Sequence, residues 1–550
     1  MRDQRCEVLI VGGGTGGCAA ALAACRAGKR VIMTEPCEWI GGQFTSQAVP
    51  PDENHWIDTH GCTDAYLQFR RAVRAYYQHH YPLNAAARAN HALNPGTGFV
   101  SRLTYEPKVS HAVFRDMLAP YESRGLLTIF RYFEPSAAVV KGDTVVAVSF
   151  RSLRGEPAFS VEAPMILDAT ELGDLLPLAG CEFVTGAESR RETGELHAPE
   201  EANPNNVQAL TWCAALGYDP EPGADHTIEK PEQYDYWRDY VPELSPPWPG
   251  KLFSWTDCVP YTLKARTNYL FPHERDPQAG RNGQSYFKFR QIVGAEHWDR
   301  AFLPLEATIA NWPMIDYIEG NLLSDQETER ARATHDARQM TLSMIYWLQT
   351  DAPNATTGGT GYPGIYPRGD AVGTNDGLAQ YPYIREARRI RARFTITEAH
   401  VGSEMRYGSS RIPGVRAAPE LVGKQGERFA DSIGIGHYRL DLHMSTGHDN
   451  YIDISTVPFQ IPLGALIPVR LKNLIPAAKN IGTTHISNGC YRLHPVEWNI
   501  GEAAGALAAY CLERSLEPAA LYEDEQQRER FQSELTRQGF RLDWPTTIPG

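Results

Sequence analysis

The chain of 550 residues is long enough for two or three domains, each with its own core. Its composition, 42% hydrophobic and 22% charged, is ordinary for a soluble globular enzyme. The net charge of −13 argues against a nucleic-acid groove, and no apolar run approaches the roughly 20 residues that a membrane span needs. The ten cysteines form no CxxC pair, and residues 1–17 run into a predicted strand without a cleavable signal. We therefore expect a cytoplasmic protein that binds neither nucleic acid nor membrane.

The first predicted elements form a nucleotide-binding unit. Val8 to Val11 are an unbroken apolar run, as a buried parallel strand requires. Gly12-x-Gly14-x-x-Gly17 predicts a tight turn that brings the backbone close to a pyrophosphate, at the start of a helix over 15–27. The next strand, over 30–34, is followed by Glu35, whose carboxylate can accept hydrogen bonds from ribose hydroxyls and would repel a 2′-phosphate. The pattern predicts a site for the ADP half of a dinucleotide and disfavours NADP.

Three further segments are expected around this unit. The second glycine pair, in Gly41-Gly42-Gln43-Phe44-Thr45-Ser46-Gln47, predicts a loop beside the phosphates, with a surface turn as the alternative. Residues 126–132 and 137–150 alternate in polarity and predict a small antiparallel meander with a turn at 141–143. Residues 165–170 predict an apolar strand that returns to the sheet and ends against the nucleotide.

The middle of the chain, about 186–380, is rich in aromatic residues and prolines. It contains a predicted long helix over 325–349 and a glycine-rich loop over 351–380. Aromatic side chains mostly build cores, but this density beside irregular backbone favours a pocket for a flat or sugar-like molecule.

Two clusters of charged residues follow. We expect the five arginines at positions 385, 388, 389, 391 and 393 to form a solvated, salt-bridged segment. Anchoring of an anionic substrate and a subunit contact are the alternatives, so a homo-oligomer stays open. His437, His443 and His448 lie on a predicted strand and loop, where lining of a substrate site is favoured over a metal site.

The C-terminal region pairs a strand over 473–478 with a helix over 496–512. Glycine and alanine at 501, 503, 504, 505, 508 and 509 leave much of that helix nearly free of side chains. Because a helical glycine costs about 1 kcal/mol relative to alanine, we interpret the pattern as room for a flat ligand, with tight helix packing as the alternative. Residues 513–550 read as a polar tail, and a subunit-contacting helix within it stays open.

The order of these motifs resembles the FAD-dependent oxidoreductases of the glutathione-reductase-like superfamily, of the fumarate-reductase-like and GidA-like kind. Residues 311–313, 383–390 and 501–505 are similar to stretches of a broad bacterial family within it. The resemblance implies an α/β fold, with a Rossmann-like FAD-binding domain of three-layer ββα architecture and an inserted α+β substrate domain. The divisions that it implies are 1–185 and 381–512 for FAD binding, 186–380 for a substrate or cap domain, and 513–550 for the tail.

The resemblance also implies which residues hold the cofactor. The pyrophosphate and ribose would be held by Gly12, Gly14, Thr15, Gly16, Gly17 and Glu35. The ribityl chain, adenine and flavin would be held by Gly41, Gly42, Gln43, Thr45, Ala137, Ala169, Thr170, Asn480, Gly482, Gly501, Ala503 and Ala504. One departure is Glu171, which follows Asp168-Ala169-Thr170 where relatives often have glycine. It places a bulkier acid beside the cofactor.

The mechanism is constrained by two absences from the sequence, a second GxGxxG unit and a CxxC pair. We expect FAD to exchange two electrons directly with a small organic substrate, by hydride transfer at flavin N5. The segment 483–495 supplies the catalytic candidates: His494 and His485 for a proton, and Arg492 for a carboxylate or oxyanion, with helix capping as the alternative. An FAD-dependent monooxygenase, a tRNA-modifying flavoprotein, and covalent attachment of FAD through His55, His60 or Cys62 stay open; no metal is expected.

Overall fold

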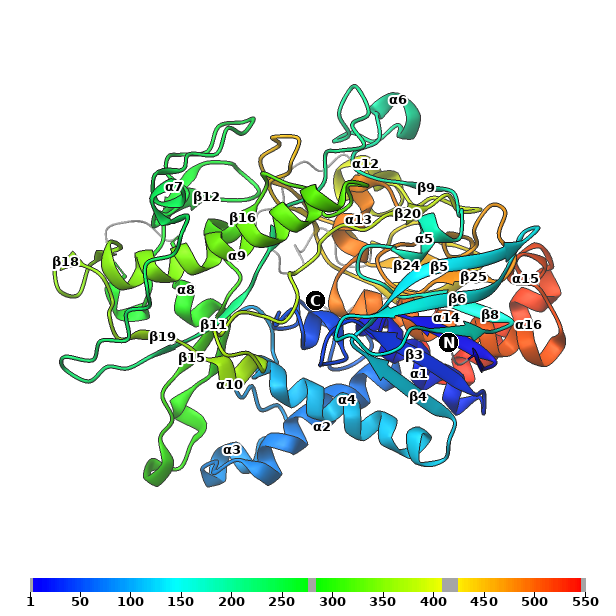
Figure 1. Cartoon of the computed structure of the whole chain (residues 1–550), viewed down its shortest axis with the longest axis horizontal. Helices are drawn as coiled ribbons and strands as arrows, with labels where there is room; N and C mark the ends of the chain where they lie inside the picture. The colour runs from blue at the N-terminus through cyan, green and yellow to red at the C-terminus, as the bar shows by residue number, and fades with distance from the viewer. Residues whose placement is uncertain (1–2, 276–282, 408–423, 546–550) are drawn as a thin grey trace.

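A five-stranded parallel sheet lies at the centre of one half of the molecule, in the order β25-β8-β2-β3-β4 (Figure 1). The computed structural model describes residues 3–275, 283–407 and 424–545. The carboxyl ends of β2, β3 and β8 lie together, because Val11 pairs with both Thr34 and Asp168. The strands span Val8–Val11 (β2), Val31–Glu35 (β3), Leu127–Arg131 (β4), Met165–Asp168 (β8) and Leu474–Pro476 (β25).

Each face of this sheet is covered by a different layer, as the alternation of side chains along a strand requires. Val8 and Ile10 belong to the core formed with the helices α1 (Thr15–Arg26) and α14 (His494–Arg514). Leu9 and Val11 belong to a separate core on the opposite face. All four residues of β2 are buried, which explains the unbroken apolar run.

The second core joins the parallel sheet to an antiparallel one, in the order β1-β7-β6-β5. Its strands are Asp3–Arg5 (β1), Phe133–Lys141 (β5), Thr144–Ser152 (β6) and Phe159–Glu162 (β7). The predicted meander was therefore wrong in one part: β4 pairs in parallel with β3 and belongs to the main sheet. Helices, parallel sheet and antiparallel sheet together form the expected three-layer ββα architecture.

Between β3 and β4 the chain forms the helices α2 (Asp64–His80), α3 (Ala85–Ala89) and α4 (Pro107–Ser123). Phe69 of α2 and Phe114 of α4 pack against Trp498 of α14, with ring centroids 5.4 and 5.7 Å apart. The two long helices therefore extend the core on the helical side of the sheet, below α1 in Figure 1.

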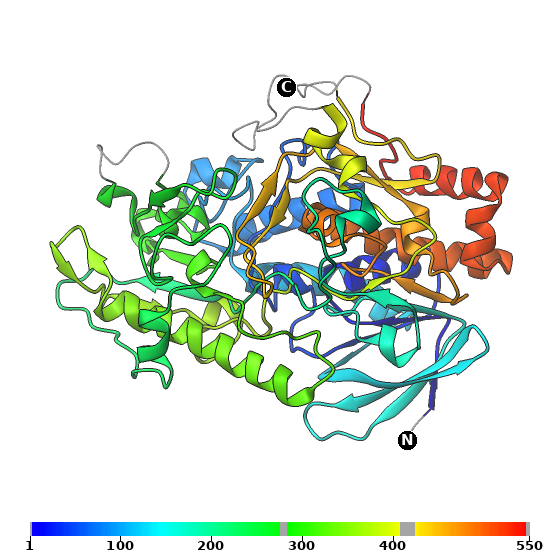
Figure 2. The ribbon, with the colours of Figure 1, turned by 90° about the horizontal axis from the view of Figure 1, so that it is seen from above.

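The middle of the chain forms the other half of the molecule, drawn in green in Figures 1 and 2. It has an antiparallel sheet in the order β14-β15-β11-β19, the long helix α9 (Glu327–Thr350) and a core of its own. The strands are Ala214–Tyr218 (β11), Gln291–Val293 (β14), Ala307–Ala310 (β15) and Ile365–Pro367 (β19). The fold is thus α/β with a further α+β part, as the resemblance implied.

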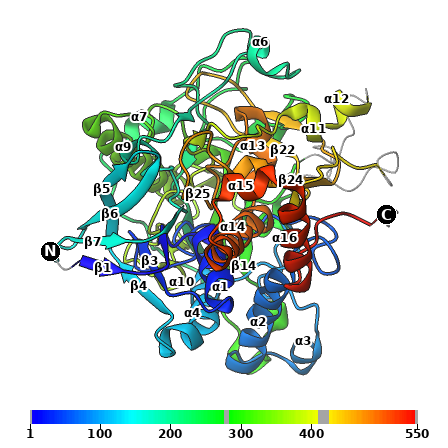
Figure 3. The same ribbon diagram turned by 90° about the vertical axis from the view of Figure 1, so that its right-hand side faces the viewer.

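Near the C-terminus, the segment 483–495, which supplies the three catalytic candidates, is largely helical. Thr484 caps the helix α13 (His485–Tyr491) with its side chain, and α14 begins at His494. The tail forms α15 (Pro518–Glu523) and α16 (Glu525–Arg537), whose buried Phe531 and Leu535 pack into the core of their own chain. Figure 3 shows α1, α14 and α16 with the right-hand side of Figure 1 facing the viewer. Among the described residues, no helix is long and apolar enough to cross a membrane.

Candidate functional site

A cavity of about 610 Å³ opens at the carboxyl ends of β2, β3 and β8. Ligands of open parallel sheets bind at this edge. One wall comes from the parallel-sheet half and the other from the middle of the chain. The lining includes Gly12, Gly14, Glu35, Cys37, Ser46, Phe133, Glu134, Pro135, Ala169, Thr170, Glu171, Arg338, Asn375, Asp376 and Tyr381.

The glycine turn approaches its neighbours too closely for side chains. Gly12 has a φ of +99°, and a side-chain carbon there would lie 2.3 Å from the carbonyl oxygen of Ala169. A side-chain carbon on Gly17 would lie 2.0 Å from the carbonyl oxygen of Gly12. The turn therefore brings the start of α1, with its unpaired N–H groups, to the edge of the cavity.

Glu35 ends β3 at the wall of the cavity, with both carboxylate oxygens held by the main chain. Gly13 N–H donates to Oε2 and Cys37 N–H to Oε1, each at 2.9 Å. Burial nevertheless raises the pKa of this carboxyl to about 8, because the backbone hydrogen bonds only partly offset the lost hydration. The two amides fix the carboxylate in one orientation at the place expected for a ribose.

A second acid lies directly over the glycine turn. A side-chain carbon on Gly14 would lie 2.5 Å, and one on Gly42 2.7 Å, from Oε1 of Glu171. That buried oxygen has no hydrogen-bond partner in the described part of the chain, while Oε2 forms an ion pair with Lys479. Since glycines and a buried lysine already surround a carboxylate here, the cradle has the chemistry to hold a negatively charged pyrophosphate.

Lys479 contacts two acids, the partly buried Glu171 and the buried Glu497. Its Nζ contacts Glu171 and lies 3.6 Å from Oε2 of Glu497, which also accepts from Gln43. Burial lowers the pKa of the lysine, but the two carboxylates outweigh it and hold the pKa above its ordinary value. Lys479 therefore stays charged at the end of β25, where it can balance an anion.

Several predicted cofactor residues lie elsewhere. Gly501 packs on Gly16, and a side-chain carbon on Gly501 would lie 2.1 Å from the Gly16 carbonyl oxygen. Gly501 and Gly505 of α14 therefore fit the helix-packing alternative, and Ala503 and Ala504 are buried in the same core. Ala137 is exposed on β5 and does not line the cavity, whereas Phe133, Glu134 and Pro135 do.

Asn480 and Gly482 also have structural partners. The Asn480 side chain donates to the carbonyl oxygen of Asp168 at 3.0 Å and joins the ends of β25 and β8. Gly482 donates its N–H to Ala465 and lies against Ala392, where a side-chain carbon would come within 2.5 Å. Of the residues of the second glycine loop, Thr45 closes the turn by donating to Ile40 at 2.7 Å.

The two histidine candidates are both buried and engaged. His494 Nδ1 accepts from the Asp52 N–H and Nε2 faces the Val49 carbonyl oxygen, each at 3.2 Å. Burial lowers the pKa of His494 well below its ordinary value, so the ring is neutral and donates through Nε2. With both nitrogens bound to the main chain, it has no free position for a substrate proton.

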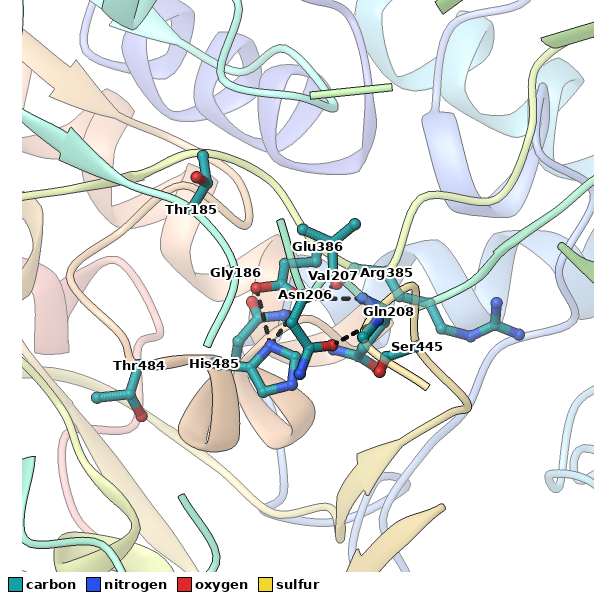
Figure 4. Close-up of polar contacts among 12 residues, drawn as sticks. Thr185, Gly186, Asn206, Val207, Gln208, Arg385, Glu386, Ser445, Thr484 and His485 are labelled. Carbon is teal, nitrogen blue, oxygen red and sulfur yellow. Dashed lines mark hydrogen bonds and ion pairs between the residues drawn. The ribbon is translucent and has the colours of Figure 1, made fainter. Parts of the chain in front are cut away.

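His485 does not line the cavity and contacts Glu386. Its Nδ1 lies 2.9 Å from Oε2 of Glu386, which also accepts the N–H of Gln208 at 3.1 Å (Figure 4). Burial raises the pKa of Glu386, but His485 and Arg389 outweigh it and lower that pKa to about 2. His485, Glu386 and the buried Arg389 therefore form an internal ion-pair group and not an exposed acid and base.

The third candidate, Arg492, belongs to a closed ring of side chains that we call the Tyr383 cluster. Arg492 donates to the Tyr383 hydroxyl at 2.6 Å and lies 3.1 Å from Oδ2 of Asp441. On the other side, Arg385 lies 4.9 Å from the Tyr383 ring centroid and 3.0 Å from Asp316. His443 closes the ring, with Nδ1 2.6 Å from Asp316 and Nε2 3.6 Å from Asp441.

The arginines, Tyr383 and Asp316 of the cluster are buried, Asp441 and His443 are partly exposed, and the arginines have unused donors. The Nε atoms of Arg385 and Arg492 have no hydrogen-bond partner among the described residues, nor has that of the neighbouring Arg290. An unsatisfied buried donor costs about 1 to 3 kcal/mol, more when it is charged. In a folded protein such a donor is normally satisfied by a bound water, ion or ligand.

The arginine run is therefore not the solvated segment that the sequence predicts. Arg385, Arg388 and Arg389 are buried, and Arg389 pairs with both Glu386 and Glu188. Arg391 and Arg393 alone among the five are exposed. Charge density in the sequence did not reveal that the stretch crosses the interior between the two halves.

Sequence reasoning missed Lys479, Tyr383 and Asp316. Lys479 follows a parallel strand, at the edge of the sheet where ligands bind. This position in the sequence could have identified it as a ligand-binding residue. Asp316 comes from the short strand β16 (Asp316–Tyr317) in the middle of the chain, and nothing nearby in sequence marks it. No group of three or more histidine, cysteine, aspartate or glutamate side chains in the described ranges could hold a metal.

The model of the family described as FAD dependent oxidoreductase matches residues 7–535. No curated protein matches the chain. A geranylgeranyl bacteriochlorophyll reductase-like protein from Thermoplasma acidophilum is 10% identical, with 98% of this chain and 85% of that chain covered and a TM-score of 0.30.

Two other solved structures cover less. The glycerol-3-phosphate dehydrogenase from Bacillus halodurans, complexed with FAD, is 14% identical over 39% of this chain and 40% of that chain, with a TM-score of 0.23. The L-proline dehydrogenase from P. horikoshii is 13% identical over 34% of this chain, which spans 25% of that protein, with a TM-score of 0.17.

Proposed function

The chain belongs to the family of FAD-dependent oxidoreductases, and from this premise we propose that it oxidises or reduces a small organic substrate by hydride transfer at flavin N5. Bound FAD supplies the two-electron chemistry. The observation that carries the proposal is the cavity, in which a glycine turn, a helix start and a fixed acid meet at one sheet edge.

We assign the cavity to FAD. The glycines at 12 and 14 and the start of α1 hold the pyrophosphate, and Glu35 holds the adenosine ribose. Phe133, Glu134 and Pro135 border the adenine in place of Ala137. Lys479 would offset the phosphate charge, and the Glu171 carboxylate lies over the turn, where it would repel the phosphates.

The remaining residues orient the substrate and exclude water. Of the three catalytic candidates, Arg492 keeps a direct role in substrate binding. Unlike His485 and His494, it combines burial with an unused donor. His494 acts as a positioning residue that holds the chain between Val49 and Asp52. Tyr381 and Asn375, from the other half of the molecule, line the cavity and close it against water.

We also propose a small-molecule partner and a cytoplasmic location. Each of the ten cysteines is buried and free, which suits a reducing compartment. The acidic balance of the chain disfavours nucleic acid.

The test is FAD binding followed by anaerobic reduction. We expect the purified protein to bind FAD, and Glu35→Ala to weaken binding at least tenfold by fluorescence titration, because the ribose contact is lost. Glu162→Ala, an exposed change on β7, is the matched control and should bind FAD normally.

The reaction class is then read from the bound flavin. A dehydrogenase is reduced anaerobically by its organic substrate, whereas a monooxygenase incorporates an atom of dioxygen into the product. A protein that takes up no FAD would overturn the proposal.

A further inference from the structure

The chemical class of the substrate follows from the Tyr383 cluster, and it rests on the proposed function. We propose that this cluster binds the carboxylate group of an organic acid through the guanidinium groups of Arg385 and Arg492, which both lie beside Tyr383. Nothing in the FAD assignment requires such a site.

The two guanidinium groups lie near the same aromatic ring. The Cζ atom of Arg385 lies 4.9 Å and that of Arg492 5.8 Å from the centroid of Tyr383. Figure 4 shows Arg385 extending away from Glu386 and His485, so its guanidinium is separate from their ion-pair group. Both arginine side chains are 1% exposed, and Tyr383 is buried as well.

Both arginines keep a free donor after their internal contacts are made. Arg385 donates to the Ala209 carbonyl and the Thr211 hydroxyl and pairs with Asp316, yet its Nε has no partner in the described residues. Arg492 likewise uses its terminal nitrogens on Tyr383 and Asp441, and its Nε is left over. Guanidinium N–H groups match carboxylate oxygens in geometry and charge.

The charge of the cluster favours a single carboxylate over a doubly charged phosphate. Its two arginines are balanced by Asp316 and Asp441. His443 lies between these aspartates, and one added negative charge disturbs the balanced cluster less than two would. The nearby Arg290 is already paired with Asp52 at 3.6 Å.

The position of the cluster fits a substrate site beside the cofactor. Asp316 comes from the middle of the chain, whereas Asp441 and Arg492 come from the other half, so the cluster lies where the two halves meet. Gln43, in the second glycine loop, donates to the Arg492 carbonyl oxygen at 2.8 Å. This bond joins the cluster to the loop beside the FAD cavity.

The experiment is calorimetric titration of the FAD-loaded protein with acetate, propionate, lactate, pyruvate and benzoate, each compared with its primary amide. The amides match the acids in shape and lack the charge. We expect at least one acid to bind at least tenfold more tightly than its amide. Arg385→Gln and Arg492→Gln should each weaken that binding tenfold or more.

Arg393→Gln is the matched control, because that arginine is exposed and paired only with Glu523 in the described residues. It should bind the acid as the unaltered protein does. If either buried variant fails to fold, the comparison of acid with amide binding to the unaltered protein decides whether the cluster recognises a carboxylate.

Two results would overturn the inference: no acid that binds more tightly than its amide, or acid binding that both glutamine variants retain in full. Either result in an FAD-loaded protein leaves the proposed function standing. Failure to take up FAD would count against the proposed function instead.

Discussion

Gly501 of α14 lies against Gly16 of α1, so closely that a side-chain carbon on Gly501 would be 2.1 Å from the Gly16 carbonyl oxygen. One turn further along, Gly505 meets Ala20 in the same way, at 2.3 Å. The two helices thus pack through their backbones. This contact fixes α1, which begins at the glycine turn, against α14, which lies near the C-terminus.

We expect Gly501→Ala to destabilise the protein by about 1 to 3 kcal/mol, because the added methyl group forces the two helices apart. FAD affinity should fall with it, since α1 starts at the cavity. Thermal unfolding and fluorescence titration measure the two effects. Gly359→Ala, where only the Thr357 hydroxyl comes within 4 Å, at 3.5 Å, is the control, and an equal effect there would contradict the packing account.

Glu171→Gln should tighten FAD binding about tenfold, or about 1.4 kcal/mol. The carboxylate lies over the glycine turn, so its charge opposes a pyrophosphate at the same place. Lys479→Met should have the opposite effect, because the balancing charge is lost. Equilibrium titration with FAD measures both, with the exposed Glu122→Gln as the control. Unchanged or weaker binding by Glu171→Gln would remove Glu171 from the phosphate cradle.

Glu502 should make the protein less stable as pH rises. Burial raises the pKa of this carboxyl from 4.5 to about 7, so the folded state favours the protonated form. Its stabilising contribution is complete below pH 4.5 and is lost, by about 3 kcal/mol, as pH rises through 7.

The checking measurement is thermal unfolding of the unaltered protein and Glu502→Gln at several pH values between 5 and 8. The amide cannot ionise, so the variant should gain stability relative to the unaltered protein as pH increases. Glu513→Gln, at an exposed position, should show no such trend. A pH-independent difference for Glu502→Gln would exclude a raised pKa.

His494 has the opposite dependence on pH. Its pKa is lowered by burial, so its contribution is complete above pH 6.5 and is lost as pH falls through the folded-state pKa. We expect His494→Ala to cost about 2 to 4 kcal/mol at pH 8, because a buried ring and two hydrogen bonds are lost. The cost should shrink toward pH 5 in thermal unfolding, and the exposed His335→Ala should cost little at either pH. A cost that grows at low pH would show that the ring is protonated in the folded state.

Local patterns in the sequence determined the nucleotide unit. The strand at Val8, the glycine turn and Glu35 are contiguous, and each depends on near neighbours, so periodicity and glycine spacing were sufficient to predict them. Strand β4 was misassigned because its pairing partner, β3, lies far away along the chain. Alternation of polarity alone does not reveal which strand is the partner.

Tertiary structure alone decided the roles of the small residues and the arginines. Small residues in α14 have the same sequence signature whether they border a ligand or another helix, and only the position of Gly16 distinguishes the two. Arg385 and Arg492 come together at Tyr383 and pair with Asp316 and Asp441, which come from separate segments of the chain. The sequence by itself determined that a dinucleotide fold forms, because that information is local. The place beside it where a substrate can bind depends on contacts between distant segments, which only the folded chain brings together.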